Sequence, residues 1–464
     1  MADPQAPPPL AKTQPSFRRQ NSTIIKLLGV GALILVMMIP LLMISGVLSE
    51  RLQRRNEAVN EITASWGKDQ EIIGPVLCLP YQYRVMVVRE MPVGDGRVER
   101  REVEETATAN AFFLPETLAI TGDVKTQLLH RGIYDAAVFR AQVGLRGRFG
   151  VPDLAALKIE AADVQWEDAF VTIAVSDLRG TREGLVVDWG GEKRPLLPGS
   201  QLPGYTTGAT GKLGITQAIA GPVEFAIALD VNGSGGIYFA PFGVQNEAEL
   251  KSNWADPGFR GSFLPAERSV RADGFTAKWQ VSYYGRDYPQ QWSSRSGNER
   301  FNERTVKTSL FGAELLSILD AYRYVERSIK YGVLFFVLVF TTFFLFEMTA
   351  RQKIHPFQYL MVGAALCLFY LALLSISEFI GFGWAYLIAA VAATGLITWY
   401  CRYFLGGGVR TLMIGAGLGG VYTFLYVTLR QQDYALLMGS IALFALLALV
   451  MFVTRRVDWY ARDA

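Results

Sequence analysis

Six long apolar stretches divide the chain into membrane-spanning and water-facing parts. Each is about as long as a helix must be to cross a bilayer. They occupy Leu27–Leu48, Tyr331–Met348, Phe357–Ser377, Phe382–Tyr400, Leu412–Leu429 and Tyr434–Val453. Backbone groups in hydrocarbon need internal partners, which helices provide. The pattern therefore predicts six transmembrane α-helices, with a long segment inserted between the first and the second.

The inserted segment shows the two-residue hydrophobic period of β-strands instead of continuous apolar runs. Runs such as Tyr81–Val88, Phe170–Val175 and Phe225–Val231 alternate apolar and polar residues, and turns rich in Gly, Pro, Asn and Asp separate them. Short strands with alternating apolar and polar residues, separated by such turns, are typical of an antiparallel β-sandwich. Phe112–Asp123 resembles Gly261–Gly274, so one large β domain and two β modules both fit the pattern.

These patterns predict seven regions in chain order. We expect a disordered tail over 1–23, transmembrane helix 1 over 24–49, a helical stalk over 50–72, a β-rich domain over 73–300, a second helical stalk over 310–330, a five-helix transmembrane block over 331–453 and a tail over 454–464. The second stalk is expected because Leu315, Leu319 and Tyr322 recur at helical spacing. The first span is predicted to be an uncleaved anchor, because its apolar part is too long for a signal peptide and no cleavage site follows it.

Basic residues in the short connections predict the orientation of the spans. Arg351 and Lys353 follow the second span and Arg402 follows the fourth, whereas Ser377–Gly383 carries no basic residue. Lys and Arg are enriched in cytoplasmic loops. Both termini are therefore expected on the cytoplasmic side, and residues 50–329 on the outer side.

Composition narrows the classes of function. The chain is 51% hydrophobic and 19% charged, with a net charge of +3, and acidic residues slightly outnumber basic ones between Glu50 and Ile329. Nucleic-acid binding is not expected without a basic face. With three Cys and two His, a zinc site is not expected either. The sequence has no G-x-S-x-G motif and no recognisable triad, so we expect no enzyme, no catalytic residue and no cofactor.

Three ionisable residues at the ends of spans are the candidates for membrane chemistry. Glu347 lies near the inner end of the second span, His355 begins the third and Glu378 ends it. Charged groups at membrane depth are costly, so a proton or cation relay is one interpretation. The other, which we favour, places all three at the membrane surfaces, with Glu347 paired to Arg351 four residues on. Small residues in the fifth span are expected to pack helices together, namely Gly415, Ala416, Gly419 and Gly420.

Several longer motifs resemble one family. They are NEAVNEITASWG (Asn56–Gly67), GPVLCLPY (Gly74–Tyr81), RGIYDAAVFRA (Arg131–Ala141), NWADPGFRGSFLPAE (Asn253–Glu267), ERSIKYGVLFF (Glu326–Phe336) and HPFQYLMVGAALCLFYLALLSISEF (His355–Phe379). Together they resemble the bacterial CreD family of inner-membrane cell envelope integrity proteins, from about Asn56 to Tyr460. Asp256 departs from the family pattern, in which His precedes Pro-Gly-Phe, and this weakens any metal or catalytic role there.

The resemblance implies a Gram-negative inner-membrane protein with a large periplasmic domain, linked to envelope integrity and a two-component stress response. It implies no known reaction or cofactor. We expect a non-enzymatic protein whose periplasmic domain binds an envelope component, with membrane lipid and a periplasmic or inner-membrane protein as expected partners. The alternative is a transporter or lipid-handling protein that uses the five-helix block.

Overall fold

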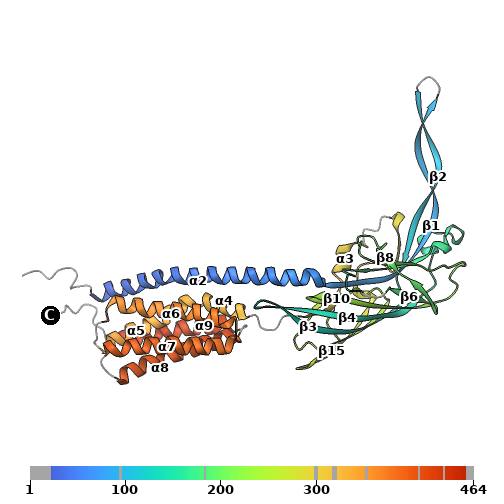
Figure 1. Cartoon of the computed structure of the whole chain (residues 1–464). Coiled ribbons are helices and arrows are strands. Elements are labelled where there is room, and N and C mark those ends of the chain that lie inside the picture. Colours follow the sequence, from blue (N-terminus) through green and yellow to red (C-terminus); the bar gives the residue numbers. More distant parts are fainter. Residues whose placement is uncertain are drawn as a thin grey trace, which may run out of the picture. The chain divides into compact units, whose positions relative to one another are not determined.

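The computed structural model describes residues 22–93, 97–181, 184–296, 301–315, 321–350, 354–405, 408–431 and 434–455. The expected tails, except for a few residues next to the helices, and the basic residues Arg351 and Lys353 lie outside this part. The chain divides into two compact units, a helical unit of Met1–Arg55 with Leu319–Ala464 and a β unit of Asn56–Ile318. Figure 1 shows the helices and the sheets of these units.

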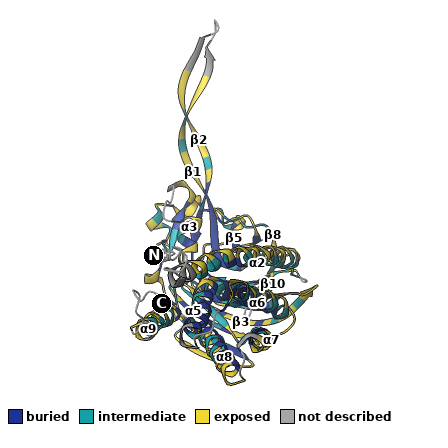
Figure 2. Cartoon of the chain, turned by 90° about the vertical axis from the view of Figure 1, so that its left-hand side faces the viewer, coloured by how far each residue is buried: buried dark blue, intermediate teal, exposed yellow. Residues whose placement is uncertain are grey.

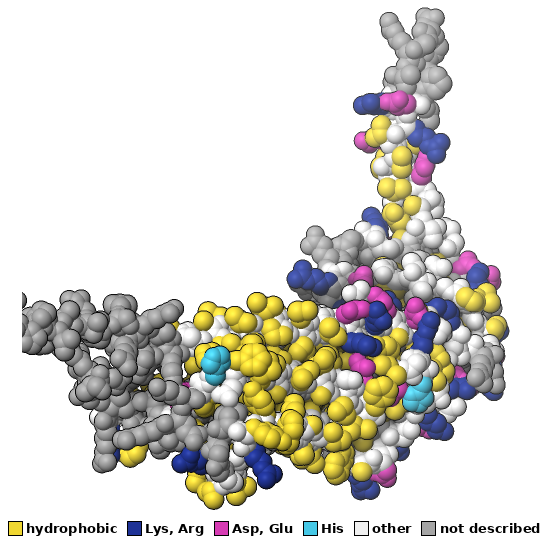
Figure 3. Space-filling view, turned by 60° about the vertical axis from the view of Figure 1, so that its left-hand side comes forward, with side chains coloured by type: hydrophobic (Ala, Val, Ile, Leu, Met, Phe, Trp, Pro, Cys, Tyr) yellow, Lys and Arg dark blue, Asp and Glu magenta, His cyan; other side chains and the backbone are white. Residues whose placement is uncertain are grey.

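The helical unit contains the expected spans. Its described helices are α2 (Ser22–Trp66), which continues into the β unit, α4 (Ala321–Lys330), α5 (Gly332–Ala350), α6 (Pro356–Ser377), α7 (Phe382–Leu405), α8 (Gly408–Arg430) and α9 (Ala435–Thr454). Five of the described helices are long and apolar enough to cross a membrane, or six if α4 and α5, bent by 52° at Tyr331, count as one span. Apolar side chains cover much of the helical unit's visible surface (Figure 3).

The second stalk differs from its prediction. We expected one helix over 310–330, but Phe311–Leu315 forms strand β17 and helix α4 begins only at Ala321. Phe311 and Ala313 are fully buried, and β17 pairs with strands on both sides. Burial between two distant strands therefore overrides the local helical spacing. Leu319, which we expected on the helix face, lies outside the described residues.

The β unit consists of two mixed sheets. The nine-stranded sheet contains β1 (Gln70–Val93), β2 (Arg97–Phe113), β5 (Phe170–Val175), β8 (Leu197–Pro198), β9 (Gly208–Lys212), β11 (Gly236–Phe239), β13 (Pro257–Gly261), β16 (Gln291–Ser293) and β17. The eight-stranded sheet contains β3 (Thr117–Arg131), β4 (Tyr134–Phe149), β6 (Val186–Trp189), β7 (Glu192–Pro195), β10 (Val223–Ser234), β12 (Gln245–Ser252), β14 (Glu267–Arg271) and β15 (Gly274–Ser282). A short helix, α3 (Glu303–Lys307), precedes β17. Most neighbours are antiparallel, as expected, but β1 with β11 and β12 with β3 are parallel.

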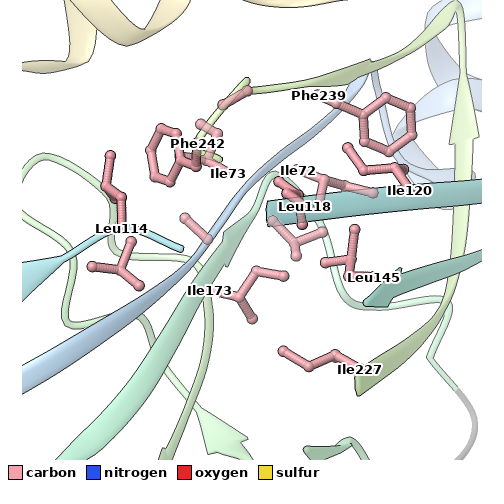
Figure 4. Close-up of a cluster of buried hydrophobic side chains, with 14 of the residues drawn as sticks. Ile72, Ile73, Leu114, Leu118, Ile120, Leu145, Ile173, Ile227, Phe239 and Phe242 are labelled. Carbon is pink, nitrogen blue, oxygen red and sulfur yellow. The ribbon is translucent and has the colours of Figure 1, made fainter. Parts of the chain in front are cut away.

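One hydrophobic core joins the two sheets. Ile72, Ile173 and Phe239 come from the nine-stranded sheet, whereas Ile120 and Leu145 come from the eight-stranded one. Figure 4 shows these side chains gathered between the two layers. The β unit is therefore one compact unit with a single core.

A long hairpin projects from the nine-stranded sheet. Strands β1 and β2 pair without interruption from Leu77↔Phe113 to Val93↔Arg97. From Gln82 to Glu90 and from Arg100 to Thr108 the hairpin's residues are exposed or half-buried (Figure 2). The last described pair toward the hairpin's end is Val93 with Arg97, and residues 94–96 lie outside the described part.

Candidate functional site

Glu347 is buried at the end of α5 next to the start of α6. Its side chain accepts a hydrogen bond from the Tyr359 hydroxyl at 3.1 Å and one from the Ile354 backbone N–H at 3.2 Å. The residue is only 8% exposed. These contacts tie the α5–α6 connection to α6. The expected pairing with Arg351 lies outside the described residues.

His355 caps α6. Its Nδ1 accepts a hydrogen bond from the Phe357 N–H at 3.2 Å, and the Gln358 side chain accepts one from the His355 N–H at 2.9 Å. Pro356 occupies the first helical position, where its missing N–H costs nothing. His355 is exposed, so its position is that of a helix-capping residue.

Glu378 joins three helices at the opposite end of α6. Its carboxylate accepts a hydrogen bond from the Tyr322 hydroxyl of α4 at 3.2 Å. It also lies 3.6 Å from Nε of Arg51 on α2. The Glu378 side chain is only 8% exposed, so this contact fastens α2 and α4 to the end of α6.

The three candidate residues do not form one site. His355 and Glu378 flank α6, whose 22 residues span about 33 Å at 1.5 Å per residue. Glu347 lies at the His355 end. None of the three lines the cavity described next.

The helical unit holds a cavity of about 1000 Å³ that the sequence did not reveal. We call it the helical cavity. It lies between α4, α7 and α8, near the Glu378 end of α6, and is lined by Ala321, Tyr324, Gly381, Phe382, Gly383, Trp384, Tyr386, Leu387, Ala390, Val391, Thr394, Gly395, Gly419, Tyr422, Thr423, Tyr426 and Arg430. One available signal was the four-residue spacing of Phe382 with Tyr386 and of Tyr422 with Tyr426, which places each aromatic pair on one helix face.

The glycines of α8 only partly follow their predicted packing role. A Cβ at Gly415 would come within 3.1 Å of the Thr398 side chain, so this glycine does let α7 and α8 approach. A Cβ at Gly419 or Gly420 would have nothing within 4 Å. Gly419 lines the helical cavity and does not lie in a helix–helix contact.

The β unit has a groove on the outer face of its eight-stranded sheet, which we call the sheet-face groove. Its volume is about 810 Å³. Two rows of side chains cross neighbouring strands β12, β3, β4 and β10. The polar row is Lys251, Asp123, Gln142 and Asp230. The small row is Thr121, Gly144 and Ala228 on β3, β4 and β10, with Glu249 beside it on β12. The small residues hollow the sheet, and the polar row supplies hydrogen-bonding groups.

Ion pairs hold the charged groups of this groove. Arg140 pairs with Asp230 through two of its nitrogens, with Nε at 2.7 Å from the carboxylate. Lys251 lies 3.0 Å from Glu249 on the same strand. The lining carries three carboxylates and two basic groups, so the groove presents a mixed polar surface instead of a strong field of one sign.

Other residues considered from the sequence have structural explanations. Arg179 pairs with Asp177, and its hydrogen bonds lower the pKa of that carboxyl. The exposed His130 pairs with Asp135 at 2.6 Å. Cys78 is fully buried, and burial raises the pKa of its thiol. Asp256 is exposed just before β13.

Comparisons with known proteins match the chain over nearly its whole length. The family model described as "Inner membrane protein CreD" matches residues 22–460. Inner membrane protein CreD of Escherichia coli (strain K12) is 31% identical over 428 residues, which cover 92% of this chain and 92% of that protein. Among solved structures, an M1 zinc metallopeptidase from Deinococcus radiodurans aligns with 36% of this chain and 39% of its own, at 9% identity and a TM-score of 0.19. That score is too low to carry any argument.

Proposed function

The chain belongs to the CreD family of inner membrane proteins, and from that membership we propose that it supports cell envelope integrity by binding an envelope component, without catalysing a reaction. The observation that carries this proposal is the sheet-face groove. A concave site with convergent polar groups is the default expectation for ligand binding. The groove is built on a rigid sheet, which suits recognition.

The chemistry of the groove favours a hydrophilic ligand. Asp123, Gln142 and Asp230 offer acceptors and an amide in one row, and Arg140 adds donors beside them. The neighbouring small row leaves room above Gly144 and Ala228. A glycan or an extended peptide could hydrogen-bond along such a row, whereas an acyl chain offers these polar side chains no hydrogen-bonding group.

This function requires the β unit in the periplasm, with both termini in the cytoplasm of a Gram-negative cell. Arg402 and Arg410 near the α7–α8 connection support this orientation, because basic residues favour the cytoplasmic side. A single cysteine introduced at exposed Ser269 or at Arg410 tests it in whole cells. A membrane-impermeant maleimide should label the first position and spare the second, and the reverse pattern would overturn the orientation.

The groove is tested by filling it. Ala228→Leu adds a side chain to the small row, while Ala226→Leu makes the same change on the same strand one row outside the groove. In cells that lack the chromosomal copy, we expect Ala226→Leu to restore growth under envelope stress and Ala228→Leu to fail at equal membrane abundance. Full restoration by Ala228→Leu would overturn the proposal.

A second candidate function is lipid handling or transport by the helical unit. The helical cavity favours this candidate, but the three ionisable residues do not, because Glu347 and Glu378 are held by tyrosines at opposite ends of α6. Glu347→Gln, His355→Ala and Glu378→Gln should therefore keep the stress phenotype of the unchanged chain. Loss of that phenotype in all three would favour a relay instead.

A further inference from the structure

Two glycines of the helical cavity border empty space instead of a neighbouring helix. A Cβ added at Gly395 on α7 or at Gly419 on α8 would meet nothing within 4 Å, and both glycines line the cavity. Small residues in membrane proteins usually allow close helix approach, as Gly415 does against Thr398. These two glycines therefore border room for another molecule.

Aromatic residues form one wall of the cavity. Phe382 stacks on Tyr324 with ring centroids 4.8 Å apart, and Tyr386 lies 5.1 Å from Tyr426. Such a wall offers a broad apolar surface. The rings come from α4, α7 and α8, so the wall brings together residues from distant parts of the chain.

The wall also carries a polar group without a partner. Tyr422 lines the cavity and is only 3% exposed. Its hydroxyl has no hydrogen-bond partner among the described residues, while its carbonyl accepts a bond from the Tyr386 hydroxyl at 2.7 Å. The Tyr422 ring packs against Phe335 of α5 and Phe369 of α6, so it forms the inner, protein-facing part of the wall.

One basic side chain, that of Arg430, lies at the end of the cavity. Arg430 is the last residue of α8, is exposed, and lies over the Tyr426 ring at 5.7 Å from its centroid. The cavity's lining residues include no Asp or Glu. An anionic group at Arg430 would thus meet one positive charge and no opposing carboxylate from the lining. Arginine also binds phosphate oxygens through its fixed fork of donors.

From these observations we infer that the helical cavity binds one anionic glycerophospholipid, with its headgroup phosphate on Arg430 and an acyl chain along Gly395 and Gly419. The site places a charged group at a helix end and an apolar tail against aromatic rings, which matches the two ends of such a lipid. The inference rests on the second candidate function and is independent of the sheet-face groove. It names a ligand class for the helical unit.

Native mass spectrometry of the full chain, released from bilayer nanodiscs, tests the inference directly. The probes are nanodiscs of phosphatidylglycerol, of phosphatidylethanolamine, and of their equal mixture. We expect one retained phosphatidylglycerol per chain, preferred in the mixture. Arg430→Gln should lower that preference roughly tenfold, the change expected when a charge-assisted hydrogen bond is lost. Arg410→Gln, at the other end of the same helix, should leave it unchanged.

A second pair of variants tests the position of the tail. Gly419→Leu fills the cavity, whereas Gly420→Leu makes the same change one residue on, at an exposed position outside it. Retention should be lost in the first and kept in the second. Equal retention in both, or an unchanged preference in Arg430→Gln, would overturn the inference. Retention of either lipid without preference would mean an unselective hydrophobic void and would also overturn it. The groove experiment is unaffected by any of these results.

Discussion

The contact of Glu378 with Arg51 and Tyr322 predicts how firmly the first span is held to the helical block. Arg51 keeps 41% of its side chain exposed, against 8% for Glu378. The coupling of this half-exposed pair should therefore lie near the upper end of the range for exposed pairs, about 0.2–1 kcal/mol, and well below the cost of about 3–5 kcal/mol for removing one partner of a fully buried pair. We expect a coupling of about 1 kcal/mol. The bond from Tyr322 to the carboxylate adds about 1.5–3 kcal/mol.

Replacements of Glu378 should therefore form a graded series. Glu378→Gln keeps an acceptor for Tyr322 but loses the charge, so it should cost about 1 kcal/mol, and Glu378→Ala should cost about 2–4 kcal/mol because both contacts are lost. The assay is detergent-induced unfolding of the full chain, followed by circular dichroism of its helices. A double-mutant cycle with Arg51→Gln isolates the coupling.

An exposed ion pair on α4 provides the control. Lys330 and Glu326 lie 2.8 Å apart at helical spacing and are 68% and 43% exposed. Their cycle should give about 0.3–0.5 kcal/mol. The reasoning fails if the coupling of Arg51 to Glu378 lies within the additivity error of about 0.3–0.5 kcal/mol, or if Glu378→Ala unfolds at the same point as the unchanged chain.

Three further predictions concern the β unit of the full chain. Burial raises the pKa of Glu71 above its ordinary value, so the contribution of Glu71 to stability is complete at low pH and is lost as pH rises through the folded-state pKa. Glu71→Gln should therefore raise the melting temperature at pH 7 and leave it unchanged near pH 4. A higher melting temperature at pH 4 with no change at pH 7 would exclude this cause. The thiol of Cys78 should react with a disulfide reagent only after unfolding, in a variant whose other two cysteines are serine, because burial raises its pKa and blocks access. A Cβ at Gly147 would lie 1.9 Å from the Thr117 carbonyl oxygen, so Gly147→Ala should destabilise by about 1–3 kcal/mol in denaturant melts, whereas Gly144→Ala, which meets only a threonine hydroxyl at 2.9 Å, should cost less.

The local pattern of apolar and polar residues was sufficient to predict elements whose conformation does not depend on distant strands. Strand β5 has the same bounds as the predicted run Phe170–Val175, and α6 begins at Pro356, as its proline and apolar length indicate. Strand β17 could not be predicted in the same way. Phe311 and Ala313 are buried by β11 and β13, which lie many residues earlier in the chain, so only the tertiary fold decides their conformation.

The candidate sites depended even more on tertiary structure. Lys251, Asp123, Gln142 and Asp230 form one row only because β12, β3, β4 and β10 are neighbours in the sheet, an order that includes a parallel pairing between distant strands. The ionisable residues at span ends were visible from the sequence, and their separation by the length of α6 follows from helix geometry. The individual hydrogen-bond partners of these residues, such as Tyr322, could not be predicted from the sequence.

The β1–β2 hairpin is the part of the β unit whose reach can change without a change of fold. From Gln82 to Glu90 and from Arg100 to Thr108, none of the described residues is buried. Removing two adjacent cross-strand pairs would shorten the hairpin by about 6.6 Å and keep every remaining side chain on its own face. Removing a single residue from one strand would turn the following side chains to the opposite face. Length variation here should therefore occur in steps of two residues on each strand, and an engineered tag at the hairpin's end would be carried well clear of the core.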